Sequence, residues 1–307
     1  MKHNIVVVGS SNTDMIIKLK RIPRAGETVL GGEFLTAAGG KGANQAVAAA
    51  RAGGRISLIA RVGRDTLGRE AIAGFIRVGI DVSHVARDNR TASGTALIYV
   101  TRNGENCIAV ASGANALLSP ADVKKARALI ARAKVLLMQL ETPLDSVLAA
   151  ARLAVSKGAT VILNPAPARA IPGELLRLVS ILTPNESEAE MLTGNRINGV
   201  RGAQKAAEAL LRRGAHTVIL TLGAKGALIA SGQEIQHIPG FKVKAVDTTA
   251  AGDVFNGALA VALTEGWSLG PAVRFANAAA AISVTRMGAQ PSAPRRRDIM
   301  RFLKSHG

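Results

Sequence analysis

Short apolar runs of strand length alternate with amphipathic stretches of helical period through most of the chain beyond residue 120. In chain order these segments are 135–140, 144–157, 160–163, 180–183, a helix from Glu186, 202–213 and 217–221. Apolar runs without polar alternation predict strands that are buried on both faces, and the helices between them predict βαβ units. We therefore expect an α/β fold with a central, mostly parallel sheet flanked by helices.

Two segments nearer the start of the chain show the two-residue alternation that is typical of antiparallel strands. They run from Asp14 to Phe34 and from Gly94 to Ala111, and Asn103-Gly104 within the second favours a tight hairpin turn. These segments predict a small β-sheet outside the central one. Because the chain shows no linker or repeat, we expect one domain over residues 1–307. The apolar stretch before Gly9 is too short for a signal peptide and predicts the first buried strand.

The segment from Val246 to Gly257 predicts a helix N-terminus that can bind an anion. It follows a strand-like stretch at 241–245, and apolar residues recur at helical spacing from Val254 onward. Small residues before Asp253 let a ligand approach backbone N–H groups that have no partner within the helix. A carboxylate beside such donors can accept a hydroxyl proton while the donors stabilise a phosphoryl group in transfer. The alternative is an Asp that only stabilises the helix terminus.

Composition and charge narrow the choice of partners. Hydrophobic residues make up 48% of the 307 residues but aromatics only 3%, so the core must consist of Val, Ile, Leu and Ala. The net charge of +18 favours anionic ligands such as ATP. The basic residues are scattered, with one run at Arg295–Arg297, and eight aromatic residues offer few platforms for base stacking. We therefore expect no specific recognition of nucleic acid.

The cysteine and hydropathy content favour a cytoplasmic protein. The single cysteine, Cys107, excludes an internal disulfide, and no apolar run is long enough to span a bilayer, so we expect no membrane association. The five histidines are dispersed without the spacing of zinc ligands.

Two motifs far apart in the chain strengthen the kinase interpretation. Residues 247–253 read Asp-Thr-Thr-Ala-Ala-Gly-Asp, and residues 39–46 read Gly-Gly-Lys-Gly-Ala-Asn-Gln-Ala. They resemble the carboxy-terminal and amino-terminal signatures of the ribokinase-like (PfkB) carbohydrate kinases, with Ala250 where many relatives have Gly. The resemblance covers essentially the whole chain. It implies a ribokinase-like fold in which about 12–36 and 93–112 form a small β lid over the sugar site.

The resemblance further implies ATP-dependent phosphorylation of D-ribose at its 5-hydroxyl. Asp253 is then the general base, and the backbone of Ala250, Ala251 and Gly252 forms the anion hole. The implied sugar pocket consists of Asn12, Asp14, Gly40, Lys41, Gly42, Asn44, Glu141 and Asp253. Several of these follow apolar strands, where ligands bind in open α/β sheets, as does Asn164. Taken alone, Asn12 or Glu141 would more often be a loop or capping residue.

The resemblance also assigns residues to ATP and Mg²⁺. The expected ATP contacts are Asn185, Thr221, Leu222, Gly223, Ala224, Lys225, Gly226, Gly252 and Asn277. The turn at 221–226 is not a Walker loop, because Lys225 lies between Ala and Gly. Asn277 stands where close relatives have His. Asn185 and Glu188 match an N-x-x-E element that implies a water-mediated Mg²⁺ contact at Glu188, although a helix N-cap explains the same pair.

Potassium and a second copy of the chain are further implied partners. The K⁺ site would consist of Asp247, Thr249, Ser283, Arg286, Gly288 and Ser292. The lid would form a homodimer. The competing interpretations are a related kinase for 2-deoxyribose, fructose or a nucleoside, and a non-catalytic sugar- or nucleic-acid-binding protein. Asn12 with Asp14 favours a sugar with vicinal hydroxyls, and the intact Asp253 favours an enzyme.

Overall fold

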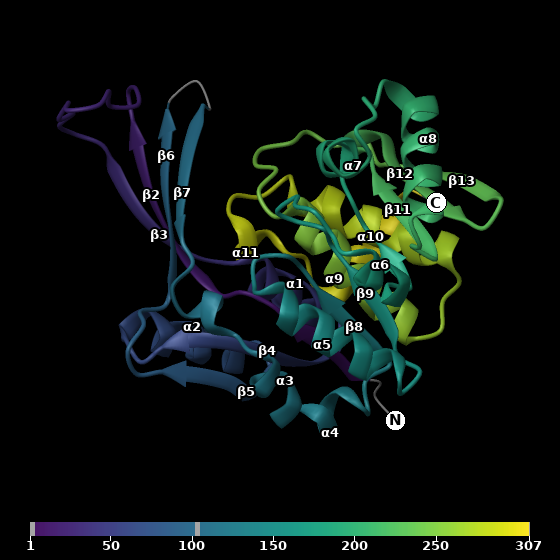
Figure 1. Cartoon of the computed structure of the whole chain (residues 1–307). Coiled ribbons are helices and arrows are strands. Elements are labelled where there is room, and N and C mark those ends of the chain that lie inside the picture. The colour runs from purple at the N-terminus through teal and green to yellow at the C-terminus, as the bar shows by residue number, and fades with distance from the viewer. Residues whose placement is uncertain (1–3, 102–104, 307) are drawn as a thin grey trace.

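The computed structural model describes residues 4–101 and 105–306. Nine strands form one sheet in the order β13-β12-β11-β10-β9-β8-β1-β4-β5 (Figure 1). The strands are β1 (Asn4–Val8), β4 (Arg55–Gly63), β5 (Asp81–Asp88), β8 (Val135–Met138), β9 (Thr160–Leu163), β10 (Ile181–Leu182), β11 (Thr217–Thr221), β12 (Gly226–Ser231) and β13 (Glu234–Pro239). Neighbours from β5 to β11 are parallel, which confirms the expected mostly parallel sheet. The apolar runs did not indicate the antiparallel pair β12 and β13 at its edge.

Helices cover both faces of this sheet. Successive residues of a strand point to opposite faces, and here the side chains on both faces are apolar and must be covered. Ile5 and Val7 belong to one apolar cluster, and Val6 and Val8 to the other. The first cluster is shared with α1 (Lys41–Arg51), α2 (Thr66–Arg77), α9 (Ala251–Thr264), α10 (Leu269–Ser283) and α12 (Arg296–Ser305). The second is shared with α3 (Pro120–Lys125), α4 (Arg127–Ile130), α5 (Leu144–Val155), α6 (Gly173–Leu178), α7 (Glu186–Thr193) and α8 (Gly199–Arg212).

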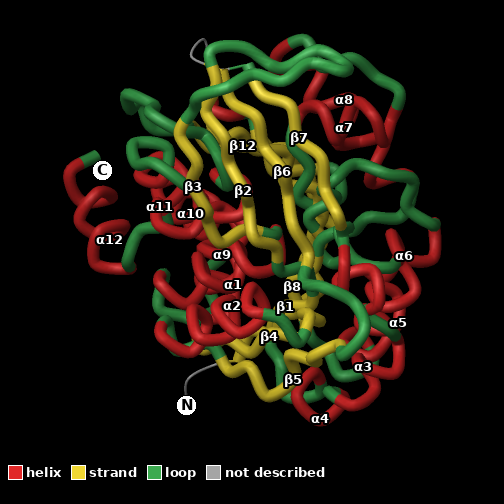
Figure 2. The backbone as a smooth tube through the Cα atoms, turned by 90° about the vertical axis from the view of Figure 1, so that its left-hand side faces the viewer, coloured by secondary structure: helices red, strands yellow, loops and turns green. Residues whose placement is uncertain are grey.

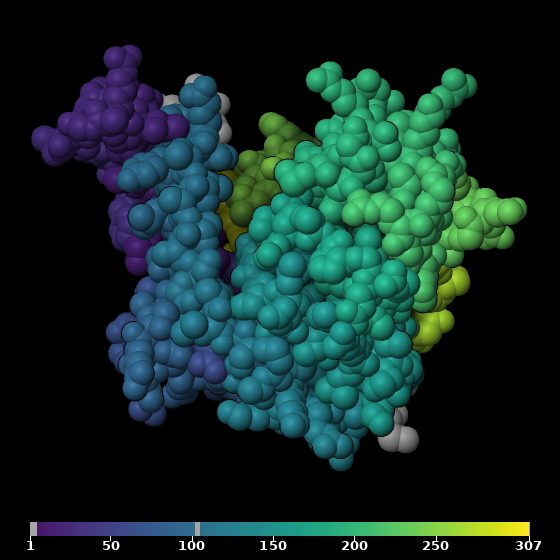
Figure 3. All heavy atoms as spheres, in the orientation of Figure 1, coloured from purple at the N-terminus to yellow at the C-terminus, as the bar shows by residue number. Residues whose placement is uncertain are grey.

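A four-stranded sheet projects from this body in the order β3-β2-β6-β7. Its strands are β2 (Asn12–Leu19), β3 (Glu33–Gly39), β6 (Gly94–Thr101) and β7 (Asn106–Ala111). Figure 2 shows them side by side, with antiparallel hairpins β2–β3 and β6–β7 joined by a parallel β2–β6 pair. The two predicted hairpin segments thus form one sheet. The turn predicted at Asn103-Gly104 lies outside the described residues. Figure 3 shows the hollow between this sheet and the body.

The expected strand at 241–245 is wrong, because this segment is an irregular connection between β13 and α9. Phe241 is buried against helices, Val243 is half-buried, and Ala245 is exposed. The ring of Phe241 packs edge-on against Phe302 of α12 at 5.1 Å, and the guanidinium of Arg274 lies over it. β13 already forms the edge of the sheet before this segment begins. Within the described residues, none of the helices has the length and apolarity needed to cross a membrane.

Candidate active site

Asp253 lies in the first turn of α9 and is 6% exposed. Its Oδ2 accepts a hydrogen bond of 3.0 Å from Asn44 Nδ2, and its Oδ1 accepts one of 2.9 Å from Gln45 Nε2. Both donors come from α1, which packs closely on α9 because Gly257 has no side chain. A Cβ on Gly257 would lie 2.7 Å from the backbone N of Ala49. The two signature motifs therefore meet at one buried carboxylate.

The start of α9 presents backbone donors beside this carboxylate. The N–H groups of Gly252 and Asp253 have no hydrogen-bond partner among the described residues, whereas the N–H of Ala251 points to Thr248 O at 3.3 Å. Ala250 precedes the helix with φ at +59°, the left-handed conformation that glycine adopts most readily. A helix N-terminus with such free donors favours a bound anion.

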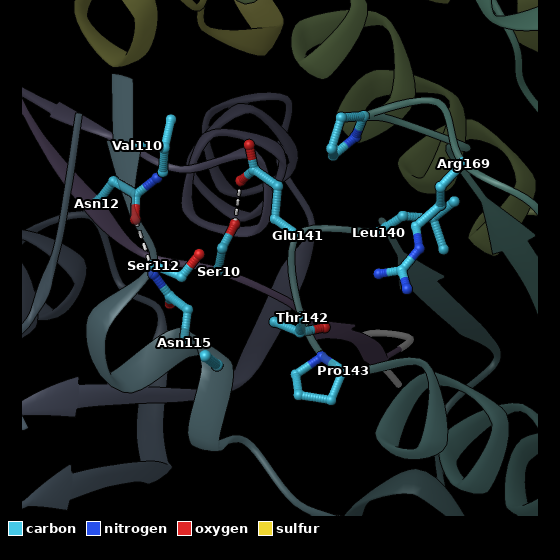
Figure 4. Close-up of a pocket in the computed structure, with 12 residues that line it drawn as sticks. Ser10, Asn12, Val110, Ser112, Asn115, Leu140, Glu141, Thr142, Pro143 and Arg169 are labelled. Atoms are coloured by element: carbon cyan, nitrogen blue, oxygen red, sulfur yellow. Dashed lines mark hydrogen bonds between the residues drawn. The ribbon is translucent and has the colours of Figure 1, made fainter. Parts of the chain in front are cut away.

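Charged groups converge on the hollow between the two sheets. The backbone N–H of Lys41 donates to Glu141 Oε2 at 2.9 Å, and Ser10 Oγ donates to the same oxygen, as Figure 4 shows. Burial, together with the charges on Glu141 and Asp253, raises the pKa of Asp14 to about 6. Burial alone would lower the pKa of Lys41, but the surrounding carboxylates, Asp253 first among them, outweigh it and raise that pKa. The Lys41 ammonium is thus held as a cation among carboxylates.

Asn12 and Asp14 are fixed by neighbours from other elements. Asn115 Nδ2 donates to Asn12 Oδ1 at 2.7 Å (Figure 4). Asp14 fills the space beside Gly39, where a Cβ would lie 2.3 Å from its Oδ1. Gly40 has φ at +86°. The cavity at this side has a volume of about 430 Å³ and is bordered by Asn12, Asn115 and Glu141, with Val110 of β7.

The expected sugar residues therefore lie around one hollow. The structure brings together residues at the start of β2, after β8 and at the starts of α1 and α9: Asn12, Asp14, Gly40, Lys41, Gly42, Asn44, Glu141 and Asp253. Asn44 Oδ1 is buried and has no hydrogen-bond partner among the described residues.

A second cavity, of about 390 Å³, lies on the other side of the α9 N-terminus. Of the residues expected to bind nucleotide, Thr221, Gly223, Ala224, Gly226, Gly252 and Asn277 line it. Leu222 and Lys225 do not line it, and Asn185 is joined to Thr221 by a backbone bridge. Asn277 Nδ2 donates to the carbonyls of Ile238 and Pro239 at 3.3 and 3.2 Å. This amide therefore closes the end of β13 as well as facing the cavity.

Asn185 and Glu188 form a capping box at the start of α7. Glu188 N donates to Asn185 Oδ1 at 2.7 Å, and Asn185 N donates to Glu188 Oε2 at 2.9 Å. The helix N-cap, which was the alternative explanation of this pair, is thus present. Burial raises the pKa of Glu188 against the opposing effects of the Asn185 N–H and Lys41. The capping bond uses Oε2, so Oε1 stays available to a further partner.

The expected potassium residues fall into two segments that Asp247 joins. Its carboxylate accepts hydrogen bonds from Thr249 N at 2.9 Å and Gly288 N at 2.7 Å. Burial acts to raise the pKa of Asp247, but these hydrogen bonds outweigh it and lower that pKa. Ser283 is the last residue of α10. Arg286 and Gly288 follow that helix, and Ser292 ends α11 (Ala289–Ser292). No group of three or more His, Cys, Asp or Glu in the described ranges could hold a metal ion.

Comparison with known proteins agrees with this geometry. The profile of the pfkB family carbohydrate kinases matches residues 2–296. A ribokinase of Haemophilus influenzae is 46% identical over 304 residues and 99% of both chains. A solved ribokinase of Thermotoga maritima has a TM-score of 0.90 at 41% identity, over 99% of this chain and 100% of that one. An Arabidopsis thaliana ribokinase complexed with ribose and ATP has a TM-score of 0.92 at 33% identity, over 99% of each chain.

The chain belongs to the pfkB family of carbohydrate kinases. It is an ATP-dependent sugar kinase of the ribokinase type. The fold inferred from the two motifs, an α/β body with a small second sheet, is confirmed.

Sequence analysis missed several residues that shape this kinase's site. Ser10 and Asn115 hold Glu141 and Asn12, and Gln45 bonds Asp253 directly. Ser10 follows the first strand just as Asn12 does, so its position was a usable signal. Asn115 lies in a 3₁₀ turn (Gly113–Leu117) that the pattern did not indicate. Phe241 and other apolar residues of 241–245 line the second cavity, and the expected strand concealed that role.

Proposed function

We propose that this kinase transfers the γ-phosphoryl group of ATP to the 5-hydroxyl of D-ribose, with Asp253 as general base. The observation that carries this proposal is the environment of Asp253, a buried carboxylate whose two oxygens both face amide donors at a helix N-terminus. Asp253 accepts the hydroxyl proton as the oxygen attacks phosphorus. The backbone of Ala250, Ala251 and Gly252, with the N–H of Asp253, stabilises charge on the transferring group.

The charge state of Asp253 reflects opposing effects. Burial raises its pKa, and the Lys41 cation, Gln45 and Asn44 act against this rise. A base must be ionised to accept a proton, so these three partners favour the form of Asp253 that can act as the base.

Ribose is held by the polar residues of the hollow. Asn12, Asp14 and Glu141 supply acceptors for sugar hydroxyls, and the backbone at Gly40, Lys41 and Gly42 closes the other side. Asn44 donates to Asp253 through Nδ2, which leaves its buried Oδ1 as an acceptor for a hydroxyl donor. Vicinal hydroxyls both donate and accept, so they suit a pocket that combines carboxylates with amides.

ATP occupies the second cavity, so its γ-phosphoryl group reaches the α9 N-terminus from the side opposite the sugar. The apolar wall of Phe241 and Val243 suits a base, and Asn277 faces the same space. Asn185, Thr221, Leu222, Gly223, Ala224, Lys225, Gly226 and Gly252 complete the proposed nucleotide contacts. Glu188 would hold Mg²⁺ through water, because its Oε1 is not used by the capping box. Bound Mg²⁺ would neutralise phosphate charge.

A potassium ion fits beside Asp247. The carboxylate already connects Thr249 to Gly288, and the same two segments supply the backbone carbonyls of Ser283, Arg286 and Ser292. Carboxylate and carbonyl oxygens are the donors that a hard cation takes. The cation would stabilise the loop that leads into the α9 N-terminus.

We further propose one domain whose four-stranded sheet acts as a lid and pairs with a second copy. Cross-strand register places Ile17, Phe34 and Tyr99 on the face of this sheet opposite Asp14. Phe34 is 61% exposed and Leu97 on the same face 47%. An apolar sheet face of this kind favours association. Light scattering at micromolar concentration should show a dimer, and a monomer would contradict this part of the proposal.

An ADP-release assay over a panel of sugars tests the proposal. We expect ribose to give the highest kcat/KM, above 2-deoxyribose, fructose and a nucleoside. Preference for one of these others would replace ribose as the substrate but keep the reaction. No ADP release with any sugar, despite measurable sugar binding, would favour the non-catalytic alternative. Any binding of DNA should be weak and steeply salt-dependent, because it would rest on phosphate contacts.

A further inference from the structure

A chain of buried amide side chains leads from the central sheet to Asp253. Gln139, directly after β8, donates from Nε2 to Gln45 Oε1 at 2.6 Å. Gln45 Nε2 donates to Asp253 Oδ1 at 2.9 Å and to Asn164 Oδ1 at 3.0 Å. Asn164 Nδ2 in turn donates to the carbonyl of Thr183 at 3.1 Å. Gln45 is completely buried, and Gln139 is 1% exposed.

The backbone carbonyl of Thr183, at one end of this series of amides, determines the orientation of every amide in it. A backbone carbonyl can only accept, so Asn164 must turn its Nδ2 toward Thr183 and its Oδ1 toward Gln45. Gln45 must then present Nε2 to Asn164, and the second hydrogen of that Nε2 goes to Asp253. Its Oε1 is left to face Gln139, which supplies the matching donor. The fold thus requires Gln45 to face Asp253 with a donor.

The opposite carboxylate oxygen of Asp253 also faces a donor, from Asn44. Hydrogen bonds to an ionised carboxylate are stronger than those to a neutral carboxylic acid, so two N–H donors that face the two oxygens favour the carboxylate. The site is therefore built for the ionised form, in a position where burial favours the neutral form.

We infer that Gln45, oriented by Gln139 and Asn164, is a positioning residue that holds Asp253 as a carboxylate and fixes the direction of its free lone pairs. This role rests on the function proposed above. It adds Gln139 and Asn164, which follow β8 and β9, to the residues at the α9 N-terminus that support the reaction. Gln45 itself is completely buried and lines neither cavity.

Other charges around Asp253 act in both directions. The Lys41 cation opposes its protonation, and Glu141, Asp14 and Glu188 are anionic neighbours that favour it. Removing the Gln45 donor removes one of the few effects that counter burial. Protonation of Asp253 should then occur at higher pH than in the wild-type enzyme.

Gln45→Met tests the inference, because methionine keeps the length of the side chain and removes the donor. We expect kcat to fall about 10- to 100-fold, KM for ribose and ATP to stay within about threefold, and the acidic limb of the kcat–pH profile to move to higher pH. Raising the pH should restore part of the lost turnover. A purely structural role would lower thermal stability without moving this limb.

Gln139→Met is the matched control. It removes the same amide one step farther from Asp253, and Asn164 still orients Gln45. We expect the acidic limb to move in the same direction by a smaller amount. If Gln45→Met fails to fold, this smaller movement is the deciding result. If the acidic limb of the kcat–pH profile stays where it is in every variant that folds, the inference is wrong.

Asp253→Asn, alone and combined with Gln45→Met, distinguishes the role of Asp253 as base from the role of Gln45 as positioning residue. If Asp253→Asn is nearly inactive, adding Gln45→Met should cause little further loss, because both changes act on one group. A normally active Asp253→Asn would refute the proposed base. An inactive Asp253→Asn together with a Gln45→Met enzyme of normal kcat and pH profile would refute only the positioning role.

Discussion

The backbone N–H of Gly288 donates to the carboxylate of Asp247 at 2.7 Å, which joins the loop before α9 to the segment after α10. The same carboxylate also accepts from Thr249 N, so one side chain fixes both segments. A cation bound by the carbonyls of these segments would therefore stabilise the backbone that leads to Ala250 and the anion hole.

Potassium should accordingly stimulate turnover. We expect kcat to rise several-fold when K⁺ replaces a bulky organic cation at matched ionic strength, with a smaller response in Asp247→Asn. Initial rates of ADP release measure the effect. Equal rates in the two salts would show that K⁺ does not activate the enzyme.

Asp14→Ala should reduce activity on ribose far more than on 2-deoxyribose. A ligand that lacks a hydroxyl leaves a desolvated carboxylate without its partner, which typically costs about 1–3 kcal/mol. The wild-type enzyme should thus prefer ribose by roughly 5- to 150-fold in kcat/KM. Comparable losses on both sugars after the substitution would mean that Asp14 does not contact the distinguishing hydroxyl.

Asp14 should also make the stability of the sugar-free enzyme depend on pH. Its pKa is about 6 in the folded protein and 3.8 without perturbation, so the folded state binds the proton more tightly. The stabilising effect of this proton is fully present below about pH 4 and is lost as the pH rises through about 6. Asp14→Asn should therefore raise the Tm at pH 8 and change it little near pH 4. A difference in Tm that does not vary with pH would contradict the raised pKa.

Ala250→Gly should stabilise the enzyme slightly and leave turnover unchanged. A non-glycine residue in the left-handed region costs roughly 1–2 kcal/mol, and the added freedom of glycine in the unfolded chain offsets about 0.4–1 kcal/mol of any gain. Ala251→Gly is the control, since glycine in a helix destabilises by roughly 0.5–1 kcal/mol. Thermal unfolding of the pair should give opposite signs. Loss of stability in both variants would argue against strain at Ala250.

Local pattern was enough for the parallel core and for a helix N-terminus with free backbone donors at the start of α9. Buried runs such as 160–163 cannot alternate, and small residues before Asp253 leave donors exposed. Contacts between distant segments could not be predicted in this way. Gln45 meets Asp253 across 208 residues, and although it lies within the signature 39–46, nothing in that motif shows that its side chain reaches Asp253.

The segment 241–245 shows the opposite limit of sequence patterns. Its alternation of apolar and polar residues has the period of a strand, but Phe241 packs against α10 and α12, and Val243 and Ala245 line the second cavity. A two-residue period reports which side chains are buried and not what covers them. In the structure, β13 is the edge strand and 241–245 does not pair with it.

Measuring kcat and thermal unfolding on one preparation of Asp253→Asn tests the central claim most directly. The amide keeps the shape of the side chain but cannot accept the hydroxyl proton, so we expect kcat to fall roughly 10²- to 10⁴-fold. ATP binding and the fold should be nearly unchanged, because the charge at a helix terminus contributes only about 0.3–1 kcal/mol of stability. The Asn44 amide, whose Oδ1 has no partner among the described residues, can turn to accept from the amide that replaces the carboxylate. Near-normal turnover with a lowered Tm would show that Asp253 only stabilises the helix, and would contradict the proposed mechanism.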